Sequence, residues 1–134
     1  MCVFCSIVKG EIPSYKIYED ENVYAFLDIA DDVYGHTLVI PKKHYENLIE
    51  MPEDELNNVM YVVKKISKHY IDDCGFDGVN LVNCCGKDAE QSVFHFHMHI
   101  LPRKCEDGIK VYPTLTKLNN DLNVIKNHLE LKDN

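Results

Sequence analysis

The stretch QSVFHFHMHILP, residues 91–102, places a histidine at every second position: His95, His97 and His99. The residues that alternate with them are apolar, namely Phe96, Met98 and Ile100. Alternate side chains of a β-strand share one face. The pattern therefore predicts a strand with apolar residues in the core and imidazoles about 6–7 Å apart on its other side. Such a row is open to three interpretations: unrelated surface or core histidines, a metal site, or nucleophilic catalysis by one imidazole.

The remainder of the chain predicts a single α+β domain over residues 1–134. Segments rich in Tyr, Val and Phe predict strands over residues 16–20, 22–29, 35–43 and 78–85, in addition to the histidine run. Predicted helices cover residues 3–9, 52–73 and 115–131. The second helix is the long one, because Pro52 and the acidic residues after it suit a helix start. Strands in succession with one long helix indicate an antiparallel sheet rather than a βαβ array.

Composition limits the classes of partner. The chain has 134 residues, a formal net charge of −8 and no long run of lysine or arginine. We expect no nucleic-acid polymer as a partner, because such binding depends on phosphate neutralisation. No apolar run reaches the ~18 residues that cross a bilayer, and the N-terminus lacks the parts of a secretory signal. We therefore expect a cytoplasmic protein with no membrane partner and mostly reduced cysteines; a nuclear or organellar location stays open.

The histidine run and its companions resemble one known family. The segment HFHMHIL, residues 95–101, is similar to the His-φ-His-φ-His-φ-φ signature of the histidine triad (HIT) superfamily, where φ is apolar. Other segments resemble the Hint and bacterial HIT branch in the expected order: FLDI (26–29), GHTLVIPKKH (35–44), NLVN (80–83) and QSVFHFHMHILPR (91–103). The resemblance covers residues 2–103. The extension over residues 104–134 carries no usable motif and lacks the tryptophan-containing end typical of Hint proteins.

This resemblance implies a HIT-like fold, with a five-stranded antiparallel sheet and usually a homodimer. It also implies an enzyme that cleaves purine nucleotides at the α-phosphate, with AMP derivatives such as adenosine phosphoramidate or acyl-AMP as substrates. His97 would be the nucleophile and form a nucleotidyl-histidine intermediate that water hydrolyses. His99 would contact the phosphate and the leaving group. Ser92 would donate a hydrogen bond where negative charge spreads during the transfer.

The resemblance further assigns a nucleotide-binding set. Asp28 matches a carboxylate that accepts both ribose hydroxyls, a task that suits two acceptor oxygens. His36 matches a fourth family histidine close to the triad. The expected phosphate donors are Asn83, Ser92, Gln91 and the backbone N–H groups of the loop at 86–93, including that of Val93. The expected slot for the base consists of Ile7, Phe26, Leu27 and Ile29. Each of these residues has an ordinary alternative role in a loop, a turn or the core.

The N-terminal CVFC segment places Cys2 and Cys5 at a C-x-x-C spacing that suits redox chemistry or a metal. A thioredoxin-like role needs a preceding strand, and only one residue precedes Cys2. By the resemblance, His44 and His95 match positions that complete a Cys₂His₂ zinc site in zinc-bearing members. Four ligands without an open position make a structural zinc site. The alternative is a reduced cysteine pair packed in the core.

Two enzymes and one binding protein fit these residues. The leading hypothesis is the AMP-releasing hydrolase or transferase, and the nearest alternative is a dinucleoside polyphosphate hydrolase with the same triad. A zinc-containing nucleotide-binding module that acts through partners is the third possibility, but pure binding does not require a nucleophile at His97. A mononuclear zinc hydrolase is the weakest reading, because a Cys₂His₂ site leaves no open metal position.

Overall fold

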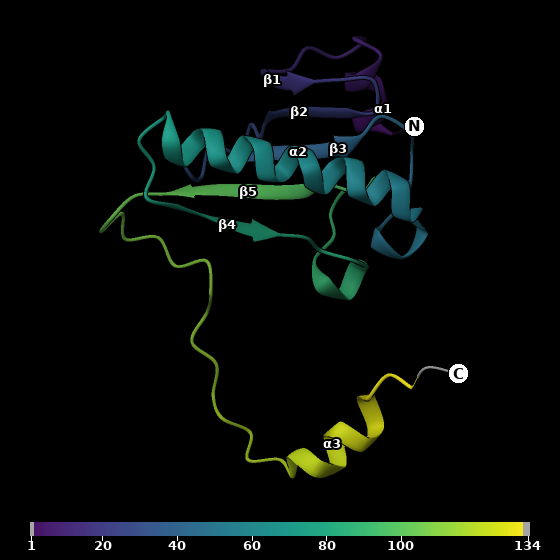
Figure 1. Cartoon of the computed structure of the whole chain (residues 1–134), viewed down its shortest axis with the longest axis vertical. Coiled ribbons are helices and arrows are strands. Elements are labelled where there is room, and N and C mark those ends of the chain that lie inside the picture. The colour runs from purple at the N-terminus through teal and green to yellow at the C-terminus, as the bar shows by residue number, and fades with distance from the viewer. Residues whose placement is uncertain (1, 133–134) are drawn as a thin grey trace.

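The computed structural model describes residues 2–132. It contains a five-stranded antiparallel sheet in the order β1-β2-β3-β5-β4, with the long helix across one face (Figure 1). The strands are β1 (Lys16–Glu19), β2 (Val23–Leu27), β3 (Thr37–Pro41), β4 (Gly78–Val82) and β5 (Met98–Arg103). The helices are α1 (Val3–Val8), α2 (Glu53–Asp72) and α3 (Leu122–Leu129), with 3₁₀ turns at Leu48–Glu50 and Lys87–Ala89. The predicted α+β architecture is confirmed.

Helix α2 begins and ends as its sequence predicts. Pro52 occupies the N-cap position, and three acidic residues lie in the first turn, where they complement the positive end of the helix dipole. The buried apolar residues recur at helical spacing: Val59, Val62, Val63, Ile66 and Tyr70. Gly75 follows the end of the helix with a φ of 82°, a conformation that suits glycine. In the described part of the chain, no helix is long and apolar enough to cross a membrane.

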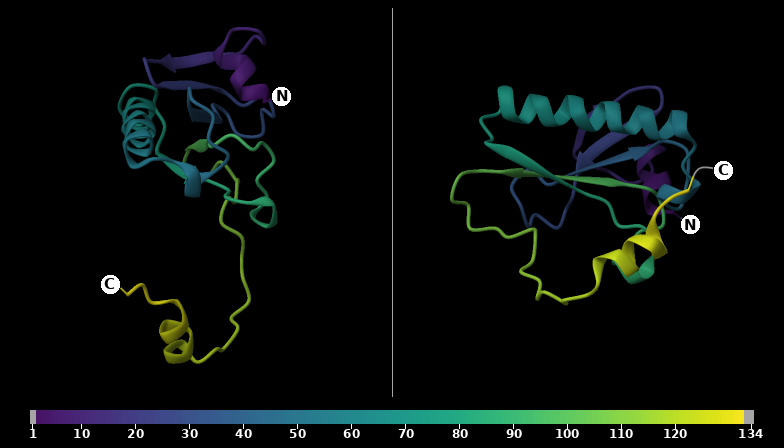
Figure 2. Two further views of the ribbon diagram at one scale, coloured as in Figure 1. Left: turned by 90° about the vertical axis from the view of Figure 1, so that its right-hand side faces the viewer. Right: turned by 60° about the horizontal axis from the view of Figure 1, so that its bottom comes forward.

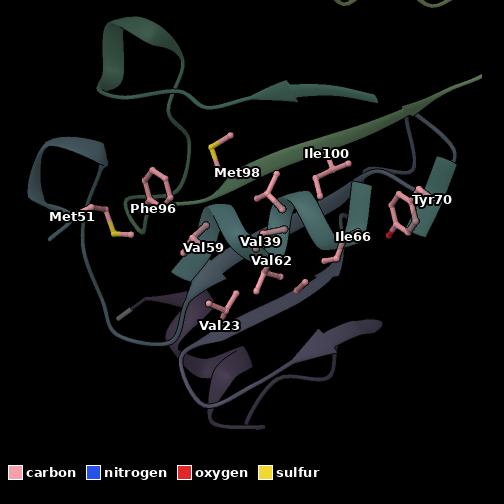
Figure 3. Close-up of a cluster of buried hydrophobic side chains, with 12 residues drawn as sticks. Val23, Val39, Met51, Val59, Val62, Ile66, Tyr70, Phe96, Met98 and Ile100 are labelled. Atoms are coloured by element: carbon pink, nitrogen blue, oxygen red, sulfur yellow. The ribbon is translucent and has the colours of Figure 1, made fainter. Parts of the chain in front are cut away.

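The sheet has two buried faces, because side chains alternate along each strand. One face packs on α2 (Figure 3); its central residues include Val23, Val39, Met98 and Ile100. The opposite face packs on α1 through Phe4, Ile7, Tyr24, Phe26, Leu38 and Ile40. His99 lies between Met98 and Ile100 in β5 and pairs with Leu38 of β3. The alternation therefore turns His99 toward the α1 face.

The prediction that the whole histidine run forms one strand is wrong. Strand β5 begins at Met98, so His95 and His97 precede it. The backbone N–H of Phe96 donates to the carbonyl of Tyr45 at 2.7 Å, which takes this segment away from the regular ladder. The alternation nevertheless holds, because Phe96 joins the core under α2 while both His95 and His97 contact the ring of Phe4 on the α1 face.

The C-terminal helix is shorter than predicted. Helix α3 covers Leu122–Leu129 rather than residues 115–131 and has no buried residue. It starts where the side chain of Asp121 accepts a hydrogen bond from the N–H of Asn123 at 3.0 Å, a typical N-cap. Asn119, with a φ of 62°, interrupts a helix before that point. Residues 104–121 form an extended connection that carries α3 away from the sheet (Figures 1 and 2).

Candidate active site and metal centre

His97 is a buried imidazole whose free nitrogen can be identified. Its Nδ1 lies 2.8 Å from the backbone carbonyl of His95, so Nδ1 carries the proton and Nε2 keeps its lone pair. Burial lowers the pKa of His97, which favours the neutral ring. The side-chain amide of Asn83 donates to the carbonyl of His97 at 2.9 Å and fixes the backbone at this point. The result is a neutral, oriented imidazole.

A pocket of about 310 Å³ opens beside His97 between α1 and the end of β2. It brings together most of the residues that sequence predicted for the nucleotide: Ile7, Phe26, Leu27, Asp28, Ile29, Ser92, Val93, His97 and His99. Its wall is largely apolar, which suits the face of a purine ring. Phe26 and Ile7 also belong to the core beneath α1, so each residue both packs in the core and lines the pocket.

Asp28 lies just beyond β2, which ends at Leu27 instead of continuing to residue 29 as predicted. One carboxylate oxygen accepts from the N–H of Ala30 at 2.9 Å. The other lies 3.6 Å from Nε2 of His36, and the side chain is 23% exposed. The carboxylate therefore keeps acceptor capacity at the edge of the pocket.

His36 and His99 form a hydrogen-bonded pair next to His97. Nε2 of His36 lies 2.8 Å from Nδ1 of His99, and Nδ1 of His36 lies 2.6 Å from a carboxylate oxygen of Asp32. Burial and the neighbouring histidines lower the pKa of His99 to about 4, whereas the hydrogen bond from His36 lowers the pKa of Asp32. Asp32 was not singled out in the sequence, because nothing distinguishes it there from other exposed acidic residues.

Gln91 has a structural position. Its amide donates to the carbonyls of Glu46 at 2.6 Å and Val93 at 3.0 Å, and its oxygen accepts from the N–H of Gly86 at 2.8 Å. These contacts use the side chain to shape the loop at 86–93, and the direct phosphate contact of Gln91 stays a prediction. Ser92, by contrast, lines the pocket beside His97.

The predicted metal ligands converge from three parts of the chain. Cys2 and Cys5 come from the start of α1, His44 follows β3, and His95 precedes β5. One donor atom from each lies within 4.8 Å of the others. A zinc ion here would tie α1 to the sheet at the point where the histidine run begins.

The spacing of these donors fits tetrahedral zinc. The Sγ to Nδ1 distances are 3.4 Å for Cys2 to His95, 3.5 Å for Cys5 to His44 and 3.6 Å for Cys5 to His95, and the two Nδ1 atoms are 3.2 Å apart. Zinc bonds of ~2.3 Å to sulfur and ~2.05 Å to nitrogen give about 3.6 Å and 3.3 Å for these edges. Nε2 of His95 donates to the carbonyl of Pro41 at 2.8 Å, which leaves Nδ1 free to bind metal.

Comparisons with known proteins agree with this geometry. Residues 9–106 match the HIT domain family. An uncharacterized HIT-like protein of Methanocaldococcus jannaschii is 55% identical over 108 residues, covering 81% of this chain and 83% of the relative. An adenosine 5′-monophosphoramidase of Candida albicans is 41% identical over 109 residues, covering 78% of this chain and 72% of the relative.

Solved structures of HIT proteins have the same fold as this chain. A HIT family protein from Bacillus subtilis superimposes with a TM-score of 0.82 at 43% identity, covering 95% of this chain and 93% of the other. A zinc-bound histidine triad family protein from Mycobacterium smegmatis gives a TM-score of 0.77 at 40% identity, covering 82% of this chain and 80% of the other. The fold and the arrangement of elements around the histidine run are therefore shared with these proteins.

Proposed function

The chain belongs to the HIT domain family, and from that premise we propose that it is a nucleotide hydrolase or transferase that cleaves AMP derivatives at the α-phosphate. The observation that carries this proposal is the state of His97. Its proton is held on Nδ1 by the carbonyl of His95, and its ring lines a pocket large enough for a nucleoside. A buried neutral imidazole with one free nitrogen is suited to nucleophilic attack.

In the proposed reaction, Nε2 of His97 attacks the α-phosphorus and the bond to the leaving group breaks. The leaving group departs with a proton, and AMP remains attached to His97 as a nucleotidyl-histidine. Water then attacks the phosphorus, the bond to Nε2 breaks, and AMP is released. The hydroxyl of Ser92 and the N–H groups of the loop at 86–93 would stabilise the spread negative charge, which is the main requirement of phosphoryl transfer.

An adenosine phosphoramidate is the substrate class that we propose. Support comes from the relative in Candida albicans, which is named an adenosine 5′-monophosphoramidase, and from the apolar wall of the pocket. The direct test follows AMP release from adenosine 5′-phosphoramidate by chromatography. Steady release supports the proposal. Well-folded protein that binds AMP but releases none from this substrate would contradict it, and dinucleoside polyphosphates would then be assayed.

Asp28→Asn should weaken AMP binding by about 10- to 100-fold, because each hydrogen bond to a charged group contributes about 1.5–3 kcal/mol. The amide keeps the size of the carboxylate but offers one acceptor instead of two. Calorimetric titration with AMP and with its 2′,3′-dideoxy analogue separates the ribose contact from general effects. The wild-type preference for AMP should largely disappear in the variant. An equal loss for both ligands would remove the ribose role of Asp28.

We also propose a structural zinc ion on Cys2, Cys5, His44 and His95. Support comes from the donor spacing, which fits a tetrahedral ion, and from the zinc-bound relative in Mycobacterium smegmatis. Such an ion stabilises the fold and takes no part in the reaction, because its four ligands are all protein side chains. The hydrogen bond from His95 to Pro41 would orient the ring for the metal.

A homodimer is a further part of the proposal. Strand β4 lies at one end of the sheet, so one side of its backbone has no partner strand within the described residues. Exposed strand edges are pairing sites for another chain, and Leu81 of β4 is 44% exposed. Light scattering after size-exclusion chromatography should give twice the mass of the 15.5 kDa chain. A monomer across the micromolar range would contradict this.

A further inference from the structure

A chain of three side chains leads from the protein surface to the reaction site. Asp32 is exposed, His36 is buried, and His99 lines the pocket beside His97. The carboxylate of Asp32 lies 2.6 Å from Nδ1 of His36, and Nε2 of His36 lies 2.8 Å from Nδ1 of His99. Each link is a hydrogen bond, so the position of one proton fixes the position of the next.

The first link sets the tautomer of His36. A carboxylate can only accept, so the proton of this bond belongs to Nδ1 of His36. Nε2 of His36 then has two states. In the neutral ring it accepts the proton on Nδ1 of His99, which leaves Nε2 of His99 as an acceptor. In the imidazolium ring it donates to Nδ1 of His99, and Nε2 of His99 then carries its own proton as a donor.

Asp28, His36 and His99 also place one donor atom each within 4.8 Å of one another, as a metal site would. The spacing argues against a metal here. The two ring nitrogens are 2.8 Å apart, the length of a hydrogen bond, whereas the corresponding pair in the Cys₂His₂ cluster is 3.2 Å apart. Two nitrogens bound to one zinc ion are about 3.3 Å apart. The pair shares a proton rather than an ion.

From this geometry we propose that Asp32 is a positioning residue: it holds His36 so that the His36–His99 pair stores a proton and delivers it to the leaving group. We call these three residues the Asp32 relay. The inference rests on the proposed function, because it specifies how the leaving group obtains its proton. The titratable groups that face the pair are Asp28, Asp32 and His97, and the charge of each of the two carboxylates acts to raise the pKa of His99.

The relay gives one proton to the leaving group and later recovers one from water. As the bond from phosphorus to the leaving nitrogen breaks, Nε2 of His99 gives its proton to that nitrogen. Nδ1 of His99 takes the proton from Nε2 of His36, and His36 becomes neutral. When water attacks the nucleotidyl-histidine, its proton enters at Nε2 of His99 and the same steps run in reverse. His99 stays neutral overall, in keeping with its low pKa.

The test compares two leaving groups in Asp32→Asn. An amine needs a proton to leave, whereas p-nitrophenolate does not. General acid catalysis contributes at least ~100-fold, so weakening it should lower kcat for adenosine 5′-phosphoramidate by about tenfold or more. The kcat for the p-nitrophenyl ester of AMP should change by less than about twofold. Asp31→Asn is the matched control, since Asp31 is exposed, neighbours Asp32, and has a φ of 49° that asparagine tolerates.

The outcomes separate the relay from the proposed function. A loss confined to the phosphoramidate supports the relay, while equal losses on both substrates, or none, would overturn it. Failure of the wild type on both substrates would overturn the proposed function instead. In that case proton NMR still tests the first link. A low-field signal from Nδ1–H of His36, present in the wild type and in Asp31→Asn but lost in Asp32→Asn, supports the link; its absence from the wild type would overturn it.

Discussion

His97→Ala should lower kcat for adenosine 5′-phosphoramidate by about 10⁴-fold or more, the order of loss seen when a nucleophile is removed. The imidazole lines the pocket and is only 5% exposed, and its Nδ1–H is held by the carbonyl of His95, so Nε2 is free to attack. AMP binding should change far less, because Asp28 and the apolar wall remain in place. The measurement is AMP release under saturating substrate, with calorimetric titration of AMP.

Two further variants make this experiment decisive. His97→Gln fills the space of the ring with an amide and guards against a loss caused only by a cavity. His69→Ala removes an imidazole that is 55% exposed and lies on α2, outside the pocket; its activity should equal that of the wild type. Rapid acid quench followed by mass spectrometry should find an adenylyl group on wild-type protein and none on His97→Gln. Wild-type rates in both His97 variants would refute the nucleophile.

Removal of zinc should lower the free energy of unfolding by about 4 kcal/mol, the value for a ligand held a thousandfold above its Kd. Cys5→Ser should have a similar effect because it takes one ligand from the cluster. The ion would join α1 to the sheet, and without it weak thiol–imidazole hydrogen bonds and the packing of Phe4 and Ile7 hold the start of α1. Urea unfolding with and without a chelator measures the change.

Elemental analysis accompanies the unfolding measurement. Protein purified without chelator should carry about one zinc per chain, and Cys5→Ser should carry almost none. Cys74→Ser is the matched control, because Cys74 is exposed and lies outside the cluster; it should retain both metal and stability. The zinc site would be contradicted if wild-type protein contained no metal and chelators did not change its stability. Cys2 and Cys5 would then be a reduced cysteine pair.

Local patterns in the sequence determined much of the fold. Helix α2 could be predicted because its apolar residues recur at helical spacing and its first turn is acidic. The row of histidines could be predicted because alternate residues keep one face even where the strand has not begun. The start of β5 could not, since it depends on the contact between Phe96 and Tyr45, which are distant in sequence. The length of α3 depends on a positive φ at Asn119, which the pattern does not reveal.

In the site, too, some residues could be predicted from the sequence and others could not. The residues expected around the nucleotide were identified through the family resemblance, and most of them line one pocket. The expected role of Gln91 at the phosphate is still a prediction, and its spacing near Ser92 says nothing of its contacts with Glu46 and Gly86. Asp32 was missed because an exposed carboxylate in a chain with 22 acidic residues gives no signal in the sequence. Only the turn that brings it to His36 distinguishes it.

The extended arm beyond β5 has an evolutionary consequence. Residues 104–107 are still bonded to the domain body, through Arg103 to Asp107 and the N–H of Cys105 to Asp77, whereas α3 has no buried residue. Mutations in α3 open no cavity in the core, so packing imposes little selection on that helix. Mutations at Ile109 or Val111 differ, because both residues line a second pocket together with His36, His97 and His99. The match to the HIT domain ends at residue 106, close to where the chain leaves the body. The part of the chain that contains α3 is therefore less constrained in length and sequence than the domain body, whose side chains must pack in a core.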